Sequence, residues 1–371
     1  MNKLRLSCPC HFGLESVLNF EIKKIGGEDI TVSDGRVSFT GGLDTLARAN
    51  LCLSTAERVL IQLAEFKALS FEELFQGVKA APLEQFIGRE DSFPVKGYSL
   101  NSVLRSVPDC QSIIKKAAVE RLKEKYSINW FEETGPIHQI QFSILKDVVT
   151  LFLDTSGAGL HKRGYRQNAN TAPIKETLAA GIIDLAHVRS SSTVCDPFCG
   201  SGTFLIEAAY KALNIAPGLK RHFAAESWDS VDNQIWVDER QRALDSIKKE
   251  NDFFAYGYDI DPETVSLAEE NCRKAGVQKR IQIQTADVRD YSNISDTITI
   301  CNPPYGERLL ELKEAEKLYS EMGKHFTANS DSPCYVISPH EDFEKFFGKK
   351  ADKKRKLYNG MIKCQLFMYF K

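Results

Sequence analysis

Residues 297–305 carry the sequence Thr-Ile-Thr-Ile-Cys-Asn-Pro-Pro-Tyr, in which an apolar run meets two consecutive prolines. An apolar run of this length, bounded by a turn signal, is typical of a buried strand in a parallel sheet. The prolines cannot donate to a sheet ladder, so the strand is predicted to end at Cys301. The sequence therefore predicts a buried strand that runs directly into a rigid loop.

The polar groups of this loop suit one kind of substrate. With the backbone held by Pro303 and Pro304, the side chain of Asn302 and the carbonyl of Pro303 are expected to point outward as two hydrogen-bond acceptors. The exocyclic amine of a nucleobase carries two N–H donors, and accepting both directs the nitrogen lone pair at an electrophile. Tyr305 offers a flat face for stacking the base. Asn302, Pro303, Pro304 and Tyr305 are thus the predicted catalytic residues.

Composition limits the class of protein. The chain has 371 residues, which predicts two or three domains, and its 43% hydrophobic and 26% charged residues are typical of a globular protein. No apolar run approaches the roughly 20 residues that span a bilayer, and the start lacks a signal-peptide core. We therefore expect no membrane segment and a cytoplasmic location. With a net charge of −2, any surface for nucleic acid must be a local patch.

The cysteines argue against a metal or disulfide framework. Ten of them are scattered along the chain, which indicates reduced thiols. The cluster Cys8-Pro9-Cys10-His11 has no second ligand pair at zinc spacing, so no metal site is predicted.

The pattern of elements divides the chain into four parts. Residues 1–57 and 58–155 each resemble a small α+β unit, and the second contains a long lysine-rich helix after Pro108. Residues 156–172 are a predicted linker. From 173 to 371, helices alternate with strands, which is typical of an α/β domain with a parallel sheet. The domain is expected to end in a hairpin that turns at Asn359-Gly360.

The linker carries the run His161-Lys162-Arg163-Gly164-Tyr165-Arg166. Basic residues that flank an aromatic residue and glycines fit a loop that meets phosphate and a stacked base. The alternative is a solvated hinge. Lys162, Arg163, Tyr165 and Arg166 are therefore candidate RNA contacts.

A second loop is predicted to bind a cofactor. The strand 193–196 leads through a glycine-containing turn into the helix 203–213, and such glycines let the backbone approach a ligand closely. The turn lacks the Lys-Ser/Thr pair of a phosphate loop, which disfavours a triphosphate and favours a ligand with an amino-acid end, a ribose and an adenine. Its residues are Asp196, which could meet the ligand's ammonium directly or through water, Pro197, Phe198, Cys199, Gly200, Ser201 and Gly202.

Acids follow the next two strands. Asp259, with its neighbour Ile260, is predicted to bind the ribose diol and is preferred to Asp261. Asp261 instead resembles a helix N-cap with Pro262 as the first helical residue. Asp287 could accept from an adenine amine or cap its own loop. Asn302, at the end of the following strand, is expected to contact the cofactor as well as the target amine.

Cys199 is an alternative candidate for a nucleophile, because some base methylases attack the ring of the base through a cysteine. It lies inside the cofactor loop, however, and an amine target needs no covalent attack. We expect in-line transfer of a methyl group from a sulfonium, driven by positioning, with the amine proton lost to water or a nearby oxygen.

These motifs resemble those of class I S-adenosylmethionine-dependent methyltransferases. Residues 196–202 resemble the first motif of that family, and Asn302-Pro303-Pro304-Tyr305 resembles the fourth. The longer form, residues 302–309, is similar to the large-subunit ribosomal RNA guanine-N2 methyltransferases and their bacterial relatives. Residues 160–166 and 172–180 resemble the segment entering their catalytic domain, and Phe93-Pro94-Val95 and residues 108–111 resemble their THUMP domain.

The resemblance covers the whole chain and implies its architecture and partners. It implies a ferredoxin-like unit, a THUMP domain, and a Rossmann-like domain with a seven-stranded, mostly parallel sheet and a C-terminal antiparallel hairpin. The implied cofactor is S-adenosyl-L-methionine. The implied partner is structured RNA, either 23S ribosomal RNA or a large-subunit assembly intermediate, with Lys175 and Arg308 as further RNA contacts.

The favoured function is methylation of guanine N2 in 23S ribosomal RNA. The same loop also serves adenine amines, so adenine-N6 methylation of RNA, or less readily of DNA, stays open. A non-catalytic RNA-binding assembly protein and a methylase for small-molecule or protein amines are further alternatives. The basic run 353–356 could contact RNA or could protect a solvated hairpin edge.

Overall fold

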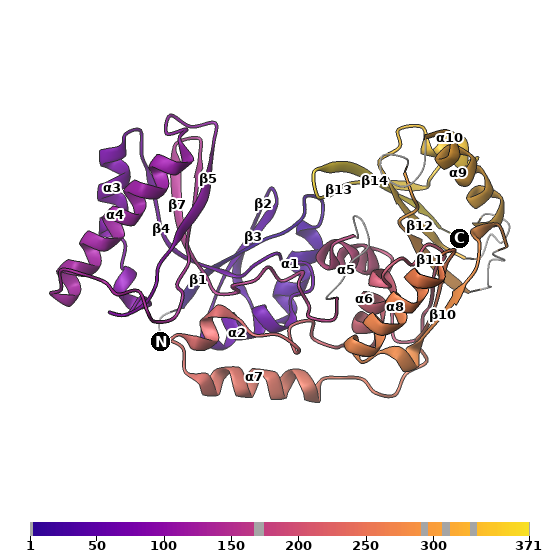
Figure 1. The fold of residues 1–371 in the computed structure, drawn as a ribbon, viewed down its shortest axis with the longest axis horizontal. Helices are drawn as coiled ribbons and strands as arrows, with labels where there is room; N and C mark the ends of the chain where they lie inside the picture. The colour runs from indigo at the N-terminus through magenta and orange to yellow at the C-terminus, as the bar shows by residue number, and fades with distance from the viewer. Residues whose placement is uncertain (1–2, 167–173, 291–295, 306–311, 327–331, 371) are drawn as a thin grey trace.

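The computed structural model describes residues 3–166, 174–290, 296–305, 312–326 and 332–370. These residues form two seven-stranded sheets, one built from the N-terminal part of the chain and one from the C-terminal part (Figure 1). Among the described helices, none combines the length and apolar character needed to cross a bilayer.

The first sheet is continuous across both N-terminal units, with strand order β2-β3-β1-β4-β7-β6-β5. β1 and β4 pair antiparallel, with Leu6 opposite Ile61, and this pairing joins the two units. β5 and β6 are its only parallel neighbours within the described residues. The strands are β1 (Leu4–Pro9), β2 (Glu28–Ser33), β3 (Arg36–Gly41), β4 (Leu60–Lys67), β5 (Val95–Leu100), β6 (Ile140–Leu145) and β7 (Val148–Asp154).

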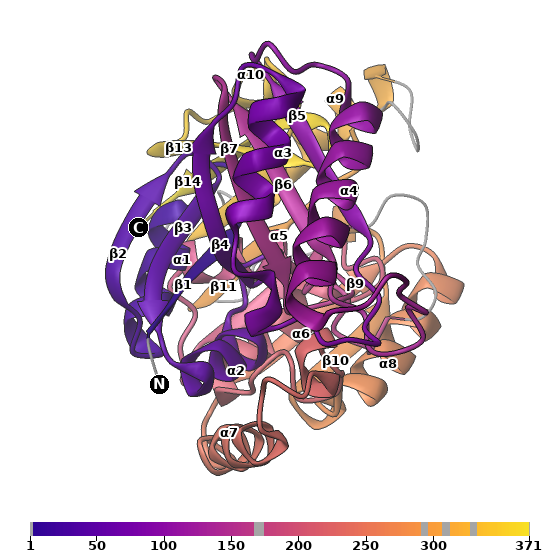
Figure 2. The same cartoon turned by 90° about the vertical axis from the view of Figure 1, so that its left-hand side faces the viewer.

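The helices of the N-terminal part of the chain pack against this sheet. The buried faces of α1 and α2 pack on β3, and α3 and α4 pack on each other and against β4 and β5 (Figure 2). Ser70 and Ser106 cap α3 and α4 by accepting from the third residue of each helix. The helices are α1 (Glu15–Lys24), α2 (Leu43–Cys52), α3 (Phe71–Ala80), η1 (Leu83–Gln85) and α4 (Val107–Tyr126).

The second sheet has the order β10-β9-β8-β11-β12-β14-β13, in which the first five strands are parallel and β14 and β13 are antiparallel. The predicted α/β class, with a mostly parallel sheet that ends in an antiparallel hairpin, is confirmed. The strands are β8 (Thr193–Asp196), β9 (Phe254–Asp259), β10 (Ile281–Thr285), β11 (Thr297–Cys301), β12 (Cys334–Ser338), β13 (Lys353–Asn359) and β14 (Ile362–Tyr369).

Two helices of this domain differ from the sequence-based expectation. The sequence predicts a helix near 239–250, and the observed helix begins earlier, at Asn233, because Asp232 accepts from the backbone N–H of Gln234 at 2.9 Å and caps it. The short aromatic helix α10 was not predicted. The helices are α5 (Glu176–Leu185), α6 (Thr203–Leu213), η2 (Ala224–Ser227), α7 (Asn233–Asp245), α8 (Pro262–Ala275), η3 (Gln278–Arg280), η4 (Val288–Asp290), α9 (Leu312–Phe326) and α10 (Phe343–Phe347).

The chain between α6 and β9 returns to the first sheet and ties the two halves together. Trp228 stacks on His138 with ring centroids 4.3 Å apart, and its indole N–H donates to the carbonyl of Ile137 at 3.1 Å. Both views show α7 lying beside α2 (Figures 1 and 2). This returning segment, residues 214–247, therefore braces the first sheet against the second domain.

A second contact brings the first helix against the catalytic half. Leu14 and Val17 are buried in the core of the second domain, together with Ile182 of α5. A Cβ at Gly181 would stand 2.3 Å from Leu14 Cδ1, so this close packing depends on glycine. The N-terminal unit is thus fixed to the domain that follows the linker.

A glycine in α9 provides a test of this packing. A Cβ at Gly323 would stand 1.8 Å from the backbone oxygen of Phe347, because α9 lies directly on α10. We expect Gly323→Ala to lower the free energy of unfolding by roughly 1–3 kcal/mol, the range for an overpacked core. Denaturant titration measures it. The helix propensity of alanine alone would instead raise stability by about 1 kcal/mol, and that outcome would contradict the described contact.

Candidate active site

A large cavity opens at the carboxyl edge of the second sheet. β8 pairs with β9 on one side and with β11 on the other, so the chain order reverses between β8 and β11. Ligands of α/β sheets bind at such a reversal. The cavity measures about 1080 Å³. Among the predicted catalytic and cofactor residues, those lining it are Asp196, Pro197, Phe198, Cys199, Gly200, Ser201, Asp259, Ile260, Asp287, Asn302, Pro303, Pro304 and Tyr305.

The loop after β8 is held by hydrogen bonds from its own backbone. Asp196 Oδ1 accepts from the N–H of Phe198 at 3.0 Å, and the N–H of Cys199 donates to the carbonyl of Tyr258 at 2.8 Å. Gly200 and Gly202 adopt φ values of 51° and 80°, in the left-handed region that favours glycine. Gly202 is the N-cap of α6 and does not line the cavity.

Asp259 connects this loop to the end of β9. Its Oδ2 accepts from the N–H of Gly200 at 3.0 Å, and its Oδ1 accepts from the N–H of Asp261 at 3.1 Å. Asp261 caps α8, accepting from Glu263 N–H at 3.0 Å and from Thr264 Oγ1 at 2.7 Å, as predicted. The carboxylate of Asp261 is thus occupied by its helix, while Asp259 faces the glycine loop.

A glycine in β9 keeps this part of the cavity close to the loop. A Cβ at Gly257 would stand 2.5 Å from Leu205 Cδ1 and 3.3 Å from the sulfur of Cys199. The loop can therefore lie flat on β9 only because residue 257 has no side chain.

Asn302 presents an acceptor that no described group satisfies. Asn302 lines the cavity, and its buried side-chain oxygen Oδ1 has no hydrogen-bond partner among the residues that the structure describes. A buried polar atom without a partner costs on the order of 1–3 kcal/mol, so such atoms gather at binding sites. The adjacent loop is fixed on both sides: the carbonyl of Pro304 accepts from Tyr319 at 3.2 Å, and Tyr305 Oη accepts from Asn359 Nδ2 at 3.1 Å.

Two acids that line the cavity, Asp196 and Asp287, differ in protonation. Burial, with a smaller contribution from nearby Asp259, raises the pKa of Asp196 to about 8. Hydrogen bonds from Arg289 lower the pKa of Asp287 to about 2; the Arg289 N–H and Nε donate to Oδ1 at 2.9 Å each. Asp287 is therefore an ionised acceptor, whereas Asp196 is poised to gain charge when a cation approaches.

Cys199 is not activated as a nucleophile. Burial raises the pKa of its thiol well above the ordinary value, and Asp196 and Asp259 add to the effect. A thiol of this kind stays protonated at neutral pH and attacks poorly.

The structure corrects two of the predicted RNA contacts. Arg163 is 2% exposed and Tyr165 is 1% exposed. Tyr165 donates to Glu207 Oε1 at 3.0 Å, and Arg163 donates to the carbonyls of Leu160 at 2.8 Å and Ser54 at 2.5 Å and lies 3.4 Å from Glu207. Both side chains serve the seam between linker and catalytic domain and are closed to RNA.

Sequence reasoning missed Glu207, the acid that organises this seam. It lies in α6, whose other residues are mostly apolar, and it is fully buried. A single acid in an otherwise apolar helix indicates that the acid has a buried partner. The partners of Glu207 are Tyr165 and Arg163, which lie 42 and 44 residues earlier in the sequence.

The other predicted RNA contacts fall into three groups. Arg166 pairs with Glu176 at 2.9 Å and donates to Thr203 Oγ1 at 3.1 Å, so it fixes the start of α6. Lys162 is exposed, and Lys175 is partly exposed beside Glu57 at 3.1 Å. Arg308 lies outside the described residues. RNA contact by Lys162, Lys175 and Arg308 stays a prediction.

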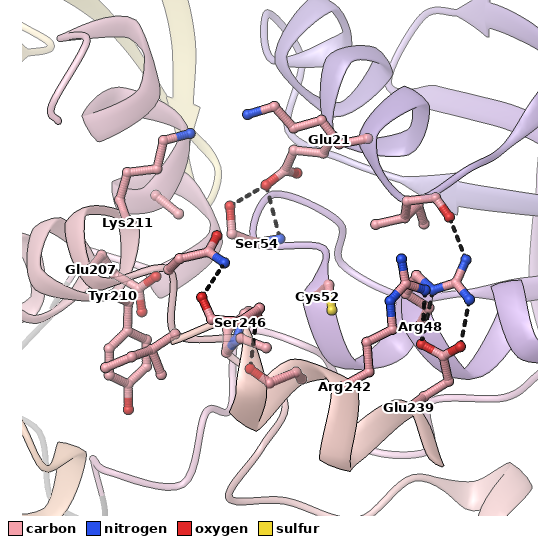
Figure 3. Close-up of a pocket in the computed structure, with 18 residues that line it drawn as sticks. Glu21, Arg48, Cys52, Ser54, Glu207, Tyr210, Lys211, Glu239, Arg242 and Ser246 are labelled. Carbon is pink, nitrogen blue, oxygen red and sulfur yellow. Dashed lines mark hydrogen bonds and ion pairs between the residues drawn. The ribbon is translucent and has the colours of Figure 1, made fainter. Parts of the chain in front are cut away.

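A second cavity, of about 280 Å³, lies between α1, α2, α6 and α7 (Figure 3). Its polar groups point at one another: Arg48 Nε donates to Glu239 at 2.8 Å, and Asn214 Nδ2 donates to the carbonyl of Ser246 at 3.0 Å. Glu21 accepts from the N–H of Ser54 at 3.1 Å. These groups stabilise the seam between the two halves and offer little to a ligand.

Comparisons with known protein families match almost the whole chain. The model of the RlmL ferredoxin-like domain matches residues 5–60, and that of the THUMP domain matches residues 68–154. The RMKL-like methyltransferase domain matches residues 163–367.

Individual relatives agree with these matches. YpsC of Bacillus subtilis (strain 168) is 42% identical over 100% of this chain and 97% of its own length. The ribosomal RNA large subunit methyltransferase K/L of Desulfotalea psychrophila is 34% identical over 96% of this chain, which spans only 51% of that enzyme. The crystal structure of SMU.472 complexed with SAH has a TM-score of 0.93 and 39% identity, covering 100% of this chain and 98% of that one.

The raised pKa of Asp196 predicts that stability depends on pH. Between about pH 4 and pH 8, Asp196 keeps its proton in the folded chain but loses it on unfolding, so stability should fall as pH rises. We expect Asp196→Asn, which can still accept from Phe198, to flatten this slope and to raise the melting temperature at pH 8. The measurement is the melting temperature of both proteins at pH 5, 6.5 and 8. The same change of melting temperature with pH in both proteins would show that Asp196 is not a buried titrating group.

The corrected role of Arg163 can be tested against exposed Lys162. Removing Arg163 leaves Glu207 buried without its cationic partner, and such losses cost about 3–5 kcal/mol. We expect Arg163→Ala to lose stability of this size in denaturant titration, whereas Lys162→Ala stays within about 0.5 kcal/mol of the parent protein. Equal stability of the two variants would contradict the buried pairing of Arg163 with Glu207.

Proposed function

We propose a function from the premise that this chain belongs to the RMKL-like methyltransferase family and uses S-adenosylmethionine as its cofactor. The proposed reaction is transfer of a methyl group to an exocyclic base amine of RNA. The proposed target is guanine N2 of 23S ribosomal RNA.

The observation that carries this proposal is the unsatisfied Oδ1 of Asn302 at the cavity wall. A target amine has two N–H donors, and one of them would satisfy this oxygen, which now bears the cost of burial alone. The second donor would meet the carbonyl of Pro303. Accepting both N–H groups leaves the nitrogen lone pair directed away from the base plane, toward the cavity.

The cavity residues fit the cofactor. The carboxylate of Asp196, poised to ionise, would hold the ammonium of the amino-acid end, and the glycine loop from Phe198 to Gly202 would lie along that end. Asp259 would bind the ribose diol, and the ionised Asp287 would accept from the adenine amine. When bound, the cofactor supplies a methyl group on a sulfonium that an amine lone pair can take.

The chain's own contribution is positioning rather than proton transfer. Pro303 and Pro304 fix the loop, and the contacts of Tyr319 and Asn359 hold it from both sides. Tyr305 would stack on the base once the base has left its helix. Methyl transfer to a neutral amine makes a cationic product that loses its proton readily to water, so no buried base is needed.

The RNA assignment rests on the other domains and on the relatives. The THUMP model matches residues 68–154, and the K/L relatives carry the name of ribosomal RNA large subunit methyltransferases. The chain spans about half the length of those enzymes, so it corresponds to part of their machinery. Guanine N2 is favoured because residues 302–309 resemble the guanine-N2 enzymes.

The test is methyl transfer to unmodified 23S ribosomal RNA made by transcription, followed by digestion and nucleoside mass spectrometry. We expect N2-methylguanosine. Asn302→Ala should lower kcat by roughly 100-fold or more, as losses of a positioned polar group in an active site do, and should affect cofactor affinity far less. Calorimetric titration with S-adenosylmethionine serves as the control for folding.

Each other outcome identifies a different error. N6-methyladenosine would keep the amine chemistry and change the base. Unimpaired kcat in Asn302→Ala would remove Asn302 from the mechanism. Absence of both cofactor binding and transfer would support a non-catalytic RNA-binding protein.

A further inference from the structure

The C-terminal hairpin extends past the edge of the sheet that bears the cavity. The last residue of β12, Ser338, lies opposite Gln365 of β14, and β13 and β14 continue to pair beyond that point as far as Asn359 and Ile362. β14 runs antiparallel, so this end of the hairpin projects from the carboxyl edge of the parallel strands. Figure 1 shows the hairpin reaching from the second sheet toward α1 and β3.

The hairpin tip is fixed between the catalytic loop and the N-terminal unit. On one side, Asn359 Nδ2 donates to Tyr305 Oη at 3.1 Å. On the other side, Arg355 donates to the carbonyl of Gly13 at 3.0 Å, and a Cβ at Gly13 would stand 2.5 Å from the carbonyl oxygen of Lys356. The tip is therefore held against Tyr305, which lines the cavity.

One face of this tip combines aromatic and basic side chains. Tyr358 meets the ring of Phe12 edge to face at 6.1 Å, and Lys356 Nζ lies 5.3 Å from the Tyr358 ring centroid. Lys363 lies directly opposite Tyr358 in the strand register, so both project from the same face. Met361 stands at the turn.

Within the described residues, the side chains of this face contact one another but stay largely open to solvent. Phe12 is 54% exposed and Met361 is 97% exposed, although both are large and apolar. Lys356 and Lys363 are exposed, and no ion pair joins either to an acid within the part of the chain that the structure describes. By contrast, Lys354 in the same hairpin pairs with Glu344 at 2.8 Å.

We propose that Phe12, Lys356, Tyr358, Met361 and Lys363, here called the hairpin patch, bind the RNA nucleotides that flank the target base. A base that leaves its helix unstacks its neighbours, and an exposed aromatic ring packed against the hairpin that contacts Tyr305 would restore stacking for one of them. The two lysines neutralise the adjacent phosphates. This inference rests on the proposed RNA methylation and assigns the flanking contacts to surfaces from both ends of the chain.

The experiment compares Phe12→Ala with Phe20→Ala in the full-length protein. Phe20 is 51% exposed on α1 and serves as a matched aromatic control away from the rim. With unmodified 23S ribosomal RNA, we expect Phe12→Ala to raise the KM for RNA at least about fivefold, the lower end for loss of one stacked base. The KM for S-adenosylmethionine and the melting temperature should not change, and Phe20→Ala should match the parent protein.

A second variant separates stacking from general damage. Phe12→Trp, which keeps a π face, should retain the low KM for RNA, whereas Phe12→Leu should behave like Phe12→Ala. Lys363→Ala should reduce the slope of log affinity against log salt by about 0.7, the value for one phosphate contact on a single strand.

The outcomes distinguish this inference from the proposed function. Methyl transfer with equal RNA KM for Phe12→Ala and the parent would overturn the hairpin patch while leaving the enzyme assignment intact. If no transfer occurs, filter binding of the same RNA still decides: weaker binding by Phe12→Ala supports the patch, and equal or absent binding overturns it.

Discussion

The parallel pairing of β11 with β8 is the constraint on which the site depends. Thr297 lies opposite Thr193, so the two parallel strands begin together, end within one residue of each other, and deliver Asn302 and the glycine loop to one edge of the sheet. Neither the loop after β8 nor the loop after β11 would by itself indicate a reaction. Side by side, one offers an acceptor oxygen without a partner, and the other offers a backbone cradle with acids on either side. In the proposed reaction, the reversal of strand order at this point is what would bring the methyl donor and the amine together.

The rest of the molecule keeps the half that carries the THUMP domain in a fixed relation to that edge. The segment 214–247 returns from the catalytic domain to stack Trp228 on His138, and Leu14 inserts into the catalytic core. The buried pair of Arg163 and Glu207 closes the seam beside the linker. Because these contacts are mostly apolar or buried, the two halves are expected to move as one body, so that RNA bound by the first half meets the cavity in a set orientation.

Local patterns predicted the site better than they predicted the assembly. The bounds of β8, β10, β11 and β12 follow from apolar runs bounded by proline, glycine or acids, and Asp261 was recognisable as a cap because Pro262 follows it. Arg163 and Tyr165 were misjudged because a basic and aromatic run has the same composition whether it faces RNA or a buried acid. That distinction depends on Glu207, more than 40 residues away. The continuity of the first sheet could not be predicted either, because neither strand carries a sequence pattern that indicates the pairing of β1 with β4.

The most direct test of the central claim is a structure of the protein with S-adenosylhomocysteine and an RNA that carries the target nucleotide. The account predicts that the exocyclic amine nitrogen lies about 2.7–3.2 Å from Asn302 Oδ1, with the base against Tyr305. It would be contradicted by a protein group bonded to that oxygen in the complex, or by a base seated in the cavity with its amine turned away from Asn302.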